Sequence, residues 1–267
     1  MEAAIRFEGV RYAWVDEDDG TRNPVFDGLD LDLPRTVVSL IGQNGTGKST
    51  LLALAAGSIV PDAGRVLVDG TDTRELRDEP TRQRKVSFVW QNMEFETKEP
   101  IGTLLETVHA GGFHAVKRPG FVAELVEAFA LAPVLARRTQ EVSKGELQRA
   151  ILAFGLLYGS PLLVMDEPIF ALEDRQKERA LEYLCAYARR EDVGLYFSLH
   201  ELELSRRYSD HLLLFRRGEP PLLGPTAELF TRETIERAYE VPYDMLKRRE
   251  ALYRKLLTDT LRVRPTS

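Results

Sequence analysis

The segment Ile41-Gly42-Gln43-Asn44-Gly45-Thr46-Gly47-Lys48-Ser49-Thr50-Leu51-Leu52 decides the fold of this chain. Four of its residues have the spacing of a phosphate-binding loop, G-x-x-x-x-G-K-[ST]: Gly42, Gly47, Lys48 and Ser49. An apolar, β-branched run at 37–41 precedes the loop, and residues 49–56 have the pattern of a helix. Strand, loop and helix in this order favour a phosphate-binding α/β fold over a glycine-rich turn that happens to contain Lys-Ser.

Each residue type in this loop suits a nucleoside triphosphate with magnesium. The glycines let backbone N–H groups surround the α- and β-phosphates, and the helix N-terminus adds positive potential. Lys48 can reach the β- and γ-phosphates, and the Ser49 hydroxyl can ligate magnesium. The residues expected to contact the nucleotide here are Gly42, Gln43, Asn44, Gly45, Thr46, Gly47, Lys48, Ser49 and Thr50.

Composition limits the function classes that are open to the 267 residues. A net charge of -6 argues against a nucleic-acid partner, whose binding needs a basic excess. The single cysteine, Cys185, fits a reducing cytosol, and no basic-then-apolar N-terminal pattern suggests secretion. The longest uncharged run, Ala150–Met165, is shorter than the ~20 residues that span a bilayer. We expect a soluble protein whose membrane role, if it has one, comes through a partner.

Two strands are predicted at the beginning of the chain. Ala3–Trp14 alternates apolar and polar residues with a bend at Gly9, and Val25–Leu33 returns after an acidic loop. Trp14, at the end of the first strand, can stack on an adenine base. It can equally be an ordinary cross-strand aromatic, and these residues alone do not separate the two interpretations.

The next segments predict a hairpin and a strand that presents a polar side chain. Arg65–Val68 is a short strand ending in the hairpin signal Asp69-Gly70. Lys85–Trp90 is an apolar strand that delivers Gln91 at its carboxyl end, where ligands of parallel sheets bind. Gln91 is therefore a candidate ligand, although a solvated glutamine is the commoner occurrence.

Helical periodicity replaces strand patterns between residues 92 and 142, which predicts a mostly helical insert in the α/β domain. A long helix then runs from Ser143 to Leu157, with Ser143 and Glu146 placed as a capping box. The same helix start can face a phosphate, and the two roles are compatible.

Two further apolar strands end in groups that a nucleotide site uses. Leu162–Glu167 ends in Asp166, which can hold magnesium through water, and Glu167, which can orient or deprotonate the attacking water. The two carboxylates could instead cap the next helix. Leu195–Leu199 leads to His200, a candidate γ-phosphate contact or a satisfied structural histidine.

The chain is expected to close its sheet at Leu212–Phe215 and to continue as helices over 227–261, separated by Pro242. The end of this region is basic, which could serve anionic lipid but is commoner on a solvated helix face. The basic residues are Arg248, Arg249, Arg254 and Lys255.

Together these motifs resemble the ATP-binding-cassette (ABC) ATPases over Ile5 to Gly218. Gly42–Ser49 is similar to the family's Walker A loop, Gln91 to its Q-loop, and residues 142–146 to its LSGGQ signature. Residues 162–167 resemble Walker B with the catalytic glutamate, Ala171-Leu172 lies in the D-loop, and His200 matches the switch histidine. Trp14 falls at the adenine-stacking A-loop position.

The resemblance implies a P-loop NTPase core of ABC type, with an N-terminal antiparallel β subdomain and an inserted helical subdomain at about 92–142. It implies an ATPase domain over 1–220 and a C-terminal helical extension over 221–267. The implied catalytic residues are Glu167, His200, Gln91 and Lys48. The implied metal ligands are Ser49, Gln91 and Asp166, and the implied nucleotide contacts include Trp14, Ser143 and Gly145. ATP and Mg²⁺ are the expected ligands.

The implied partners are a second copy of the ATPase and separate membrane subunits. ATP would lie between the Walker A loop of one copy and the signature of the other, in a homodimer with two equivalent sites. The helical insert would receive transmembrane permease subunits, which puts the chain in the cytoplasm, peripheral on the inner face of the cell membrane. No nucleic-acid partner is expected.

Four positions depart from the family pattern. In the signature, Lys144 and Glu146 stand where glycine and glutamine are usual; in the D-loop, Phe170 and Glu173 replace serine and aspartate. The expectation is an active but slow ATPase.

The tail Gly224–Phe230, followed by Ile235–Tyr243, is similar to the ends of importer ATPases for iron complexes, haem and cobalamin. The segment Gln91-Asn92-Met93-Glu94 is similar instead to the energy-coupling-factor ATPases for vitamins and metal ions. We expect an ATPase that energises a bacterial importer. The alternatives are a cytosolic ABC protein that uses ATP-driven dimerisation without a membrane partner, and a non-hydrolysing regulatory binder.

Overall fold

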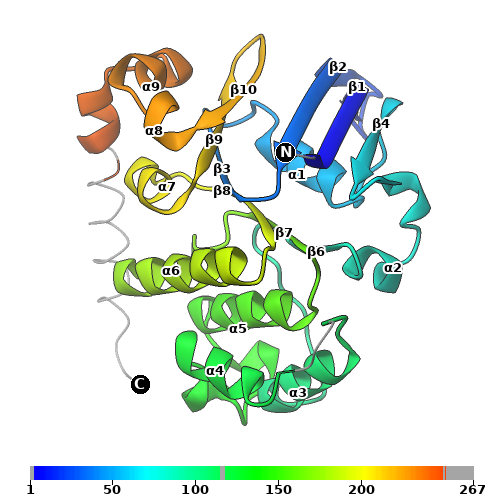
Figure 1. Ribbon diagram of the computed structural model, residues 1–267, viewed down its shortest axis with the longest axis vertical. Helices are drawn as coiled ribbons and strands as arrows, with labels where there is room; N and C mark the ends of the chain where they lie inside the picture. Colours follow the sequence, from blue (N-terminus) through cyan, green and yellow to red (C-terminus); the bar gives the residue numbers. More distant parts are fainter. Residues whose placement is uncertain (1–2, 115–117, 249, 251–267) are drawn as a thin grey trace.

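The protein contains two β-sheets of different character (Figure 1). A computed structural model describes residues 3–114, 118–248 and 250. A four-stranded antiparallel sheet has the order β2-β1-β4-β5, and a six-stranded sheet has the order β10-β9-β3-β8-β7-β6. The non-sequential order of the second sheet brings segments far apart in the chain to one edge.

The antiparallel sheet confirms the strands that alternation predicts near the N-terminus. Gly9 adopts φ +56° where the β1–β2 register shifts, so the predicted bend is a bulge. Asp69 and Gly70 both have positive φ and join β4 to β5, as the two-residue hairpin turn requires. The strands are β1 (Ala3–Val15), β2 (Arg22–Pro34), β4 (Ala63–Val68) and β5 (Thr71–Asp72).

The second sheet is parallel except at one edge. β3, β6, β7, β8 and β9 run in the same direction, and β10 pairs antiparallel with β9. Their bounds are β3 (Val37–Ile41), β6 (Val86–Val89), β7 (Leu162–Asp166), β8 (Gly194–Ser198), β9 (His211–Arg216) and β10 (Glu219–Pro225).

Strand β10 corrects two sequence predictions. The strand at 212–215 is not the last of the sheet, and the region from 221 onward begins as a strand rather than a helix. β10 contains Pro220, Pro221 and Pro225, which sequence rules read as strand breakers. Proline is tolerated here because β10 lies at the edge of the sheet, where one row of N–H groups has no neighbouring strand.

Helices fill the connections and cover both faces of the parallel sheet. The labelled α-helices are α1 (Lys48–Ala55), α2 (Glu79–Gln83), α3 (Ile101–Gly111), α4 (Phe121–Ala128), α5 (Lys144–Leu157), α6 (Asp174–Arg190), α7 (Leu202–Tyr208), α8 (Thr226–Leu229) and α9 (Arg232–Tyr239). Residues 243–248 are helical as well. Short 3₁₀ turns are η1 (Thr73–Glu75), η2 (Ala132–Val134) and η3 (Thr139–Glu141). The predicted helical character between 92 and 142 is confirmed by α3, α4 and the two turns η2 and η3.

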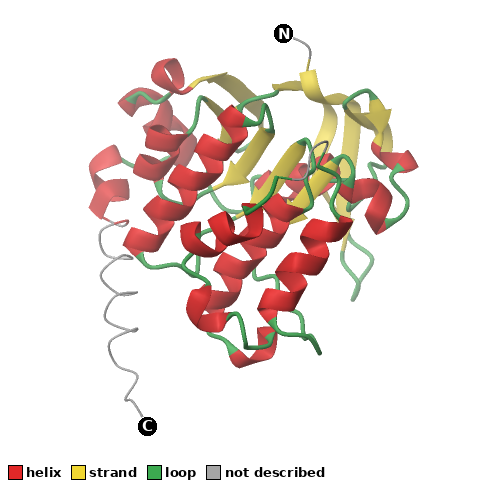
Figure 2. Ribbon diagram, turned by 60° about the horizontal axis from the view of Figure 1, so that its bottom comes forward, coloured by secondary structure: helices red, strands yellow, loops and turns green. Residues whose placement is uncertain are grey.

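Three apolar clusters form the core. The first joins one face of the parallel sheet to α5, α6 and the helices after β6, which Figure 2 shows gathered on one side. The second joins the opposite face of the sheet to α1 and the antiparallel sheet. Alternate residues of β7 divide between these clusters, Leu163 and Met165 entering the first, Leu162 and Val164 the second. The third lies between β9, α7 and α9.

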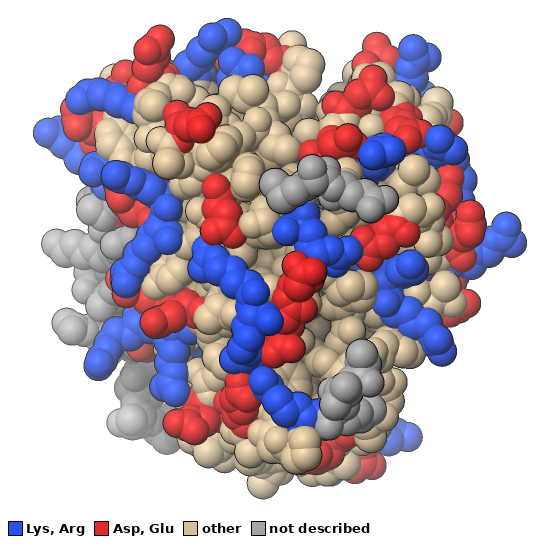
Figure 3. All heavy atoms as spheres, in the orientation of Figure 1, with Lys and Arg blue, Asp and Glu red and all other residues tan. Residues whose placement is uncertain are grey.

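Two features can be compared with the expectation of a chain without membrane spans: the distribution of surface charge and the length and polarity of the helices. On the face shown in Figure 3, Lys and Arg side chains are interspersed with Asp and Glu side chains. Within the described part of the chain, every helix is too short or too polar to cross a bilayer. Of the basic residues expected near the C-terminus, only Arg248 falls within the described residues.

Candidate functional site

The predicted phosphate-binding loop connects β3 to α1. Gly47 has φ +101° and is the N-cap of α1, which a residue with a Cβ would strain. Gly42 has φ +145°, and a Cβ there would lie 2.5 Å from the Phe215 carbonyl oxygen of β9. The motif glycines are therefore required by backbone conformation and by close packing.

Lys48 is directed into the loop rather than into solvent. Its Nζ donates to the carbonyl oxygens of Gly42, at 2.9 Å, and of Gln43, at 2.8 Å. Burial lowers the pKa of Lys48, while Glu167 and Asp166 act in the opposite direction by favouring the charged form. The ammonium group thus sits between two carbonyls and close to two carboxylates, where phosphate oxygens would be stronger partners.

The adenine-stacking candidate is linked to the same loop. Trp14 Nε1 donates to Thr50 Oγ1 at 3.1 Å, which ties the end of β1 to the first turn of α1. Trp14 remains 47% exposed and meets Tyr12 edge-to-face at 5.1 Å. Its indole is therefore anchored at the rim of the loop with much of its surface accessible, a placement compatible with both sequence interpretations.

Three predicted residues from three strand ends meet directly. Gln91, after β6, donates through Nε2 to Glu167 Oε2 at 2.9 Å. His200, after β8, has Nε2 2.6 Å from Glu167 Oε1. Glu167 itself follows β7, and its side chain is only 13% exposed, against 43% for His200. The carboxyl ends of three neighbouring parallel strands thus bring these three residues together.

Ser198 completes this group and was not anticipated from the sequence. Its Oγ lies 2.5 Å from Asp166 Oδ1, and it accepts the Glu167 N–H at 3.0 Å. Glu167 has φ +48°, an unfavourable conformation for a residue with a Cβ, and this hydrogen bond helps to fix it. A serine at the end of the otherwise apolar strand β8 is the signal that could have identified it.

A buried ion pair fixes the residue next to His200. Lys177 Nζ of α6 lies 2.5 Å from Glu201 Oε1, with side chains 4% and 18% exposed. Lysine is rarely so buried without a charged partner. The pair attaches the start of α7 to α6 and thereby restrains the backbone that carries His200. Sequence reasoning missed it because Lys177 and Glu201 belong to different elements.

The signature residues form a separate group at the start of α5. The Ser143 backbone N–H and Oγ both donate to Glu146 Oε2 at 2.8 Å, so the predicted capping box is confirmed. Lys144 pairs with Glu94 at 3.1 Å. A Cβ on Gly145 would lie 2.9 Å from the Ala171 carbonyl oxygen, which explains a glycine there.

The helix that begins at the phosphate-binding loop and the helix that begins at the signature pack on opposite faces of the parallel sheet. α1, which begins at the phosphate-binding loop, belongs to the cluster on one face, and α5 belongs to the cluster on the other. Within one chain the contacts of Ser143 and Gly145 are with Glu146 and the segment that follows Glu167, not with the loop at Lys48.

The residues present fit magnesium bound together with phosphate. Among the described residues, no group of three or more His, Cys, Asp and Glu forms a metal cage. Magnesium usually takes one or two carboxylates and completes its shell with water and substrate phosphates. Asp166, at the end of β7, is 6% exposed, and a single strand, β8, separates β7 from the strand β3 that leads into the loop. Ser49 is exposed at the start of α1.

Comparison with known proteins agrees with these motifs. The family model described as ABC transporter matches residues 26–170. The nickel import ATP-binding protein NikO of Rhodobacter capsulatus is 34% identical over 89% of this chain and 95% of its own length. The hemin import ATP-binding protein HmuV of Streptomyces coelicolor is 32% identical, over 83% of this chain and 80% of its own length.

Solved structures share the fold. The ATP-binding cassette MJ0796, a dimer in a post-hydrolysis state bound to ADP and Pi, aligns with a TM-score of 0.71 at 20% identity, covering 83% of this chain and 98% of its own. The structure of cbiO1 from Clostridium perfringens aligns with a TM-score of 0.67 at 20% identity, covering 89% and 94%. The chain belongs to the ABC transporter family and is one of its ATPases.

Proposed function

We propose that this chain binds and hydrolyses ATP to energise a membrane importer, working as one of two cassettes that close over the nucleotide. The observation that carries the proposal is the contact of Gln91 and His200 with Glu167, beside the loop that holds Lys48. Relatives named as import ATP-binding proteins for nickel and hemin support the direction of transport.

In this proposal the loop from Gly42 to Thr50 holds the triphosphate. Its backbone N–H groups and the N-terminus of α1 offer donors and positive potential to the phosphates. Lys48 exchanges its carbonyl partners for phosphate oxygens, which are stronger acceptors for an ammonium group. Trp14 stacks on the adenine, and its bond to Thr50 fixes the ring relative to the loop.

Glu167 is the proposed general base. Its carboxylate orients the attacking water and withdraws a proton from it, while Gln91 and His200 supply hydrogen bonds around the γ-phosphate. The contacts among these side chains order them before the reaction, which reduces the reorganisation needed in the transition state. Ser49, Gln91 and Asp166 would hold magnesium, which when bound neutralises charge on the phosphate oxygens.

The second cassette follows from where the signature lies. Ser143 and Gly145 begin a helix on the sheet face opposite to α1, so they suit the nucleotide of another copy better than their own. A two-fold pair of this chain would contain two equivalent sites of this kind. Dimeric cassettes of the same fold are known, as the MJ0796 structure illustrates.

The proposed permease contact lies beside Gln91. An apolar hollow of about 200 Å³ opens between β6, α3 and α5. Its walls include apolar side chains from the segment just after Gln91 and from the helical region. The lining residues are Ser87, Phe88, Val89, Met93, Phe95, Leu104, Val108, Ile151, Phe154, Gly155 and Tyr158. A short apolar helix of a membrane subunit suits this hollow, and its position next to Gln91 would link permease movement to the site.

The proposed arrangement puts the chain on the cytoplasmic face of the membrane, with an ATPase domain that includes all of β10 and therefore ends at Pro225 instead of residue 220, followed by an extension. The insert at 92–142 would be the part nearest the membrane subunits. These assignments rest on family membership and on the contacts described above.

The test is ATP turnover together with ATP-dependent dimerisation, for the wild type and for Glu167→Gln with magnesium withheld from the dimerisation assay. We expect turnover in the wild type, a loss of about a thousandfold or more in Glu167→Gln, and an ATP-bound dimer that accumulates in the variant. ATP binding without turnover or dimer in either protein would overturn the proposal. A fully active Glu167→Gln would overturn the assignment of the base.

A further inference from the structure

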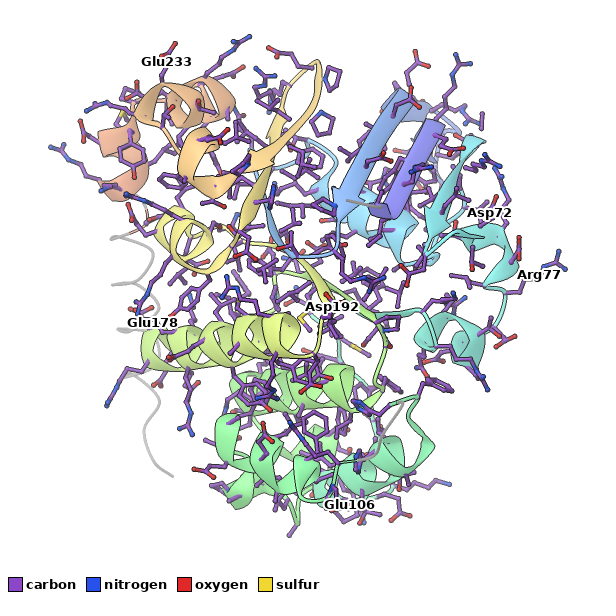
Figure 4. The ribbon with its side chains drawn as sticks, viewed as in Figure 1. Asp72, Arg77, Glu106, Glu178, Asp192 and Glu233 are labelled. Carbon is purple, nitrogen blue, oxygen red and sulfur yellow. The ribbon has the colours of Figure 1, made fainter. Side chains whose placement is uncertain are left out.

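Helix α9 packs against β9, the neighbour of the strand that leads into the phosphate-binding loop. Ile235 and Ala238 are 0% and 1% exposed and share a cluster with Ile41, the last residue of β3. Glu233 lies on the outer side of the same helix, pointing away from the body of the protein (Figure 4). The helix is therefore oriented, and its final turn is directed at the beginning of the loop.

Tyr239, the last residue of α9, contacts the first glycine of the loop. Its hydroxyl oxygen accepts the Gly42 N–H at 3.0 Å. Burial raises the pKa of Tyr239, so the hydroxyl keeps its proton and accepts through a lone pair. Gly42 is itself buried, so this N–H would lack a hydrogen-bond acceptor without the tyrosine.

In a second contact the loop again donates to the helix. The side-chain amide of Gln43 lies 3.5 Å from the carbonyl oxygen of Ala238, one of the carbonyls left free at the end of α9. α9 ends with Glu240 in the left-handed region, at φ +56°. The loop helps to satisfy the end of the helix, and the helix satisfies the beginning of the loop.

Gly42 is enclosed from two sides. The Phe215 backbone of β9 lies against the position of its missing Cβ, and Tyr239 holds its N–H. Both neighbours follow residue 170, where the match to the family model ends. The base of the nucleotide loop is thus positioned by elements outside the matched segment.

We propose that Tyr239 is a positioning residue for the phosphate-binding loop, through which α9 sets the affinity of the loop for nucleotide. The inference rests on the proposed ATP site and adds a residue to it. Without the hydroxyl, the loop gains alternative conformations in which the Gly42 N–H meets water. Nucleotide would then bind only the fraction of molecules that retain the competent loop, and apparent affinity falls by that fraction.

The same C-terminal segment also reaches the His200 side of the site. Glu250 Oε1 accepts the Leu202 N–H at 2.5 Å, at the start of α7 and two residues after His200. The N-cap of α7, Glu201, provides no side-chain cap of its own. The described end of the chain therefore holds both the loop that contacts the phosphates and the segment that carries the histidine.

The test compares Tyr239→Phe with the matched variant Tyr243→Phe in the full chain. The Tyr243 hydroxyl bonds Glu203 of α7 at 2.9 Å. ADP with magnesium is the probe, because ADP binding reports on the loop without requiring a second cassette. We expect ADP affinity to fall about tenfold in Tyr239→Phe and to change less than about twofold in Tyr243→Phe.

The outcomes separate the two proposals. A wild type that fails to bind ADP overturns the proposed function. A wild type that binds, with Tyr239→Phe losing thermal stability but keeping full ADP affinity, overturns the positioning role alone. Equal losses of affinity in both tyrosine variants would also overturn it, because a general weakening of the C-terminal segment would then suffice.

A measurement on the wild type keeps the inference testable even if Tyr239→Phe does not fold. By linkage, if α9 stabilises the nucleotide-binding loop, nucleotide must stabilise α9 by the same factor. Hydrogen exchange with and without ADP should show added protection over residues 232–240 and none over α4, which lies in a different cluster. Unchanged exchange over 232–240 at saturating ADP would contradict the inference.

Discussion

The group around Glu167 and the signature segment around Ser143 are both motifs of one function, yet they are built differently. Glu167 lies among strand ends, its side chain 13% exposed, with Gln91 and His200 at its carboxylate and the Ser198 hydroxyl accepting its backbone N–H. Ser143 is exposed, and its hydrogen bonds are with Glu146 of its own helix. The first group is complete within one chain, whereas the second is ordered locally and turned outward.

This difference shows which contacts fix the positions of the side chains in each group. Strand ends are fixed by the whole sheet, so a carboxylate there can be held by contacts from distant parts of the sequence. The helix start is fixed by its own capping box and by an exposed ion pair between Lys144 and Glu94. Disturbing the first group should therefore cost far more than disturbing the second.

The largest effect is expected from breaking the buried pair beneath His200. Lys177→Met leaves the largely buried Glu201 carboxylate without its partner and should lower the free energy of unfolding by about 3 kcal/mol. Urea denaturation of the wild type and the variant measures this change in the free energy of unfolding. The double variant Lys177→Met/Glu201→Gln should recover most of the loss, since no unpaired charge remains.

The matched control is Arg207→Met, which removes the pair with Glu178, whose side chains are 62% and 52% exposed. An exposed pair contributes at most about 1 kcal/mol, so this variant should stay near the wild type. Equal destabilisation by Lys177→Met and Arg207→Met would show that burial is not what makes the first pair important.

A smaller effect is expected from Ser198→Ala, which removes the hydroxyl between Asp166 and the Glu167 N–H. Turnover should fall about 10- to 100-fold because the two carboxylates lose their common support. ADP affinity should change little, since the loop at Lys48 is untouched.

Ser39→Ala is the control, because Ser39 is equally buried on the neighbouring strand β3 and its hydroxyl bonds the Ser205 hydroxyl of α7. Turnover measured at saturating ATP decides between them. If both serine variants lose activity alike, Ser198 acts through general packing of the sheet and not through the carboxylates.

The smallest effect is expected at the signature, where Glu146→Gln should weaken the fold slightly but strengthen the ATP-dependent dimer. Losing the charge at the helix start should lower the free energy of unfolding by about 0.5 kcal/mol. Removing a negative charge from the surface proposed to meet the second nucleotide should tighten the ATP-dependent dimer about threefold. Denaturation and analytical ultracentrifugation with ATP measure the two changes.

The pH dependence of this region follows from the capping box. The hydrogen bond from the Ser143 backbone N–H is the largest cause that lowers the pKa of Glu146. Burial acts in the opposite direction, and the Ser143 hydroxyl and the charges of Arg137 and Arg149 lower the pKa further. The stabilisation is therefore present above the pKa of an unfolded glutamate and is lost as pH falls through the lowered value. Asp78→Asn, at the N-cap of α2, should lose similar stability without changing dimerisation. A dimer effect in both variants would contradict the role given to Glu146.

Much of the fold could be predicted because local pattern and tertiary structure agree. Alternation predicted β1 and β2, the loop motif predicted the β3–α1 turn, and the capping box predicted the start of α5. Strand β10 was missed because its prolines argue against a strand unless the position at the sheet edge is known. Edge position is a tertiary fact that a local pattern does not contain.

The candidate site divides in the same way. The sequence predicted roles at the nucleotide site for Gln91, Glu167 and His200, and the structure brings the three side chains together. Ser198, Lys177 and Tyr239 were not predicted, because each acts through a partner more than 20 residues away in the sequence. The catalytic assignments themselves remain proposals for the experiments above.

The sequence by itself determined the chemistry of this protein: a loop that can hold phosphates, carboxylates at strand ends, and the order of motifs that marks an ABC ATPase. Only the tertiary structure decided which groups support that chemistry. It put α1 and α5 on opposite sheet faces and brought Tyr239 to the Gly42 N–H. The physical reason is that motifs encode short-range backbone geometry, whereas supporting contacts depend on strand order and helix packing, which only the assembled chain defines.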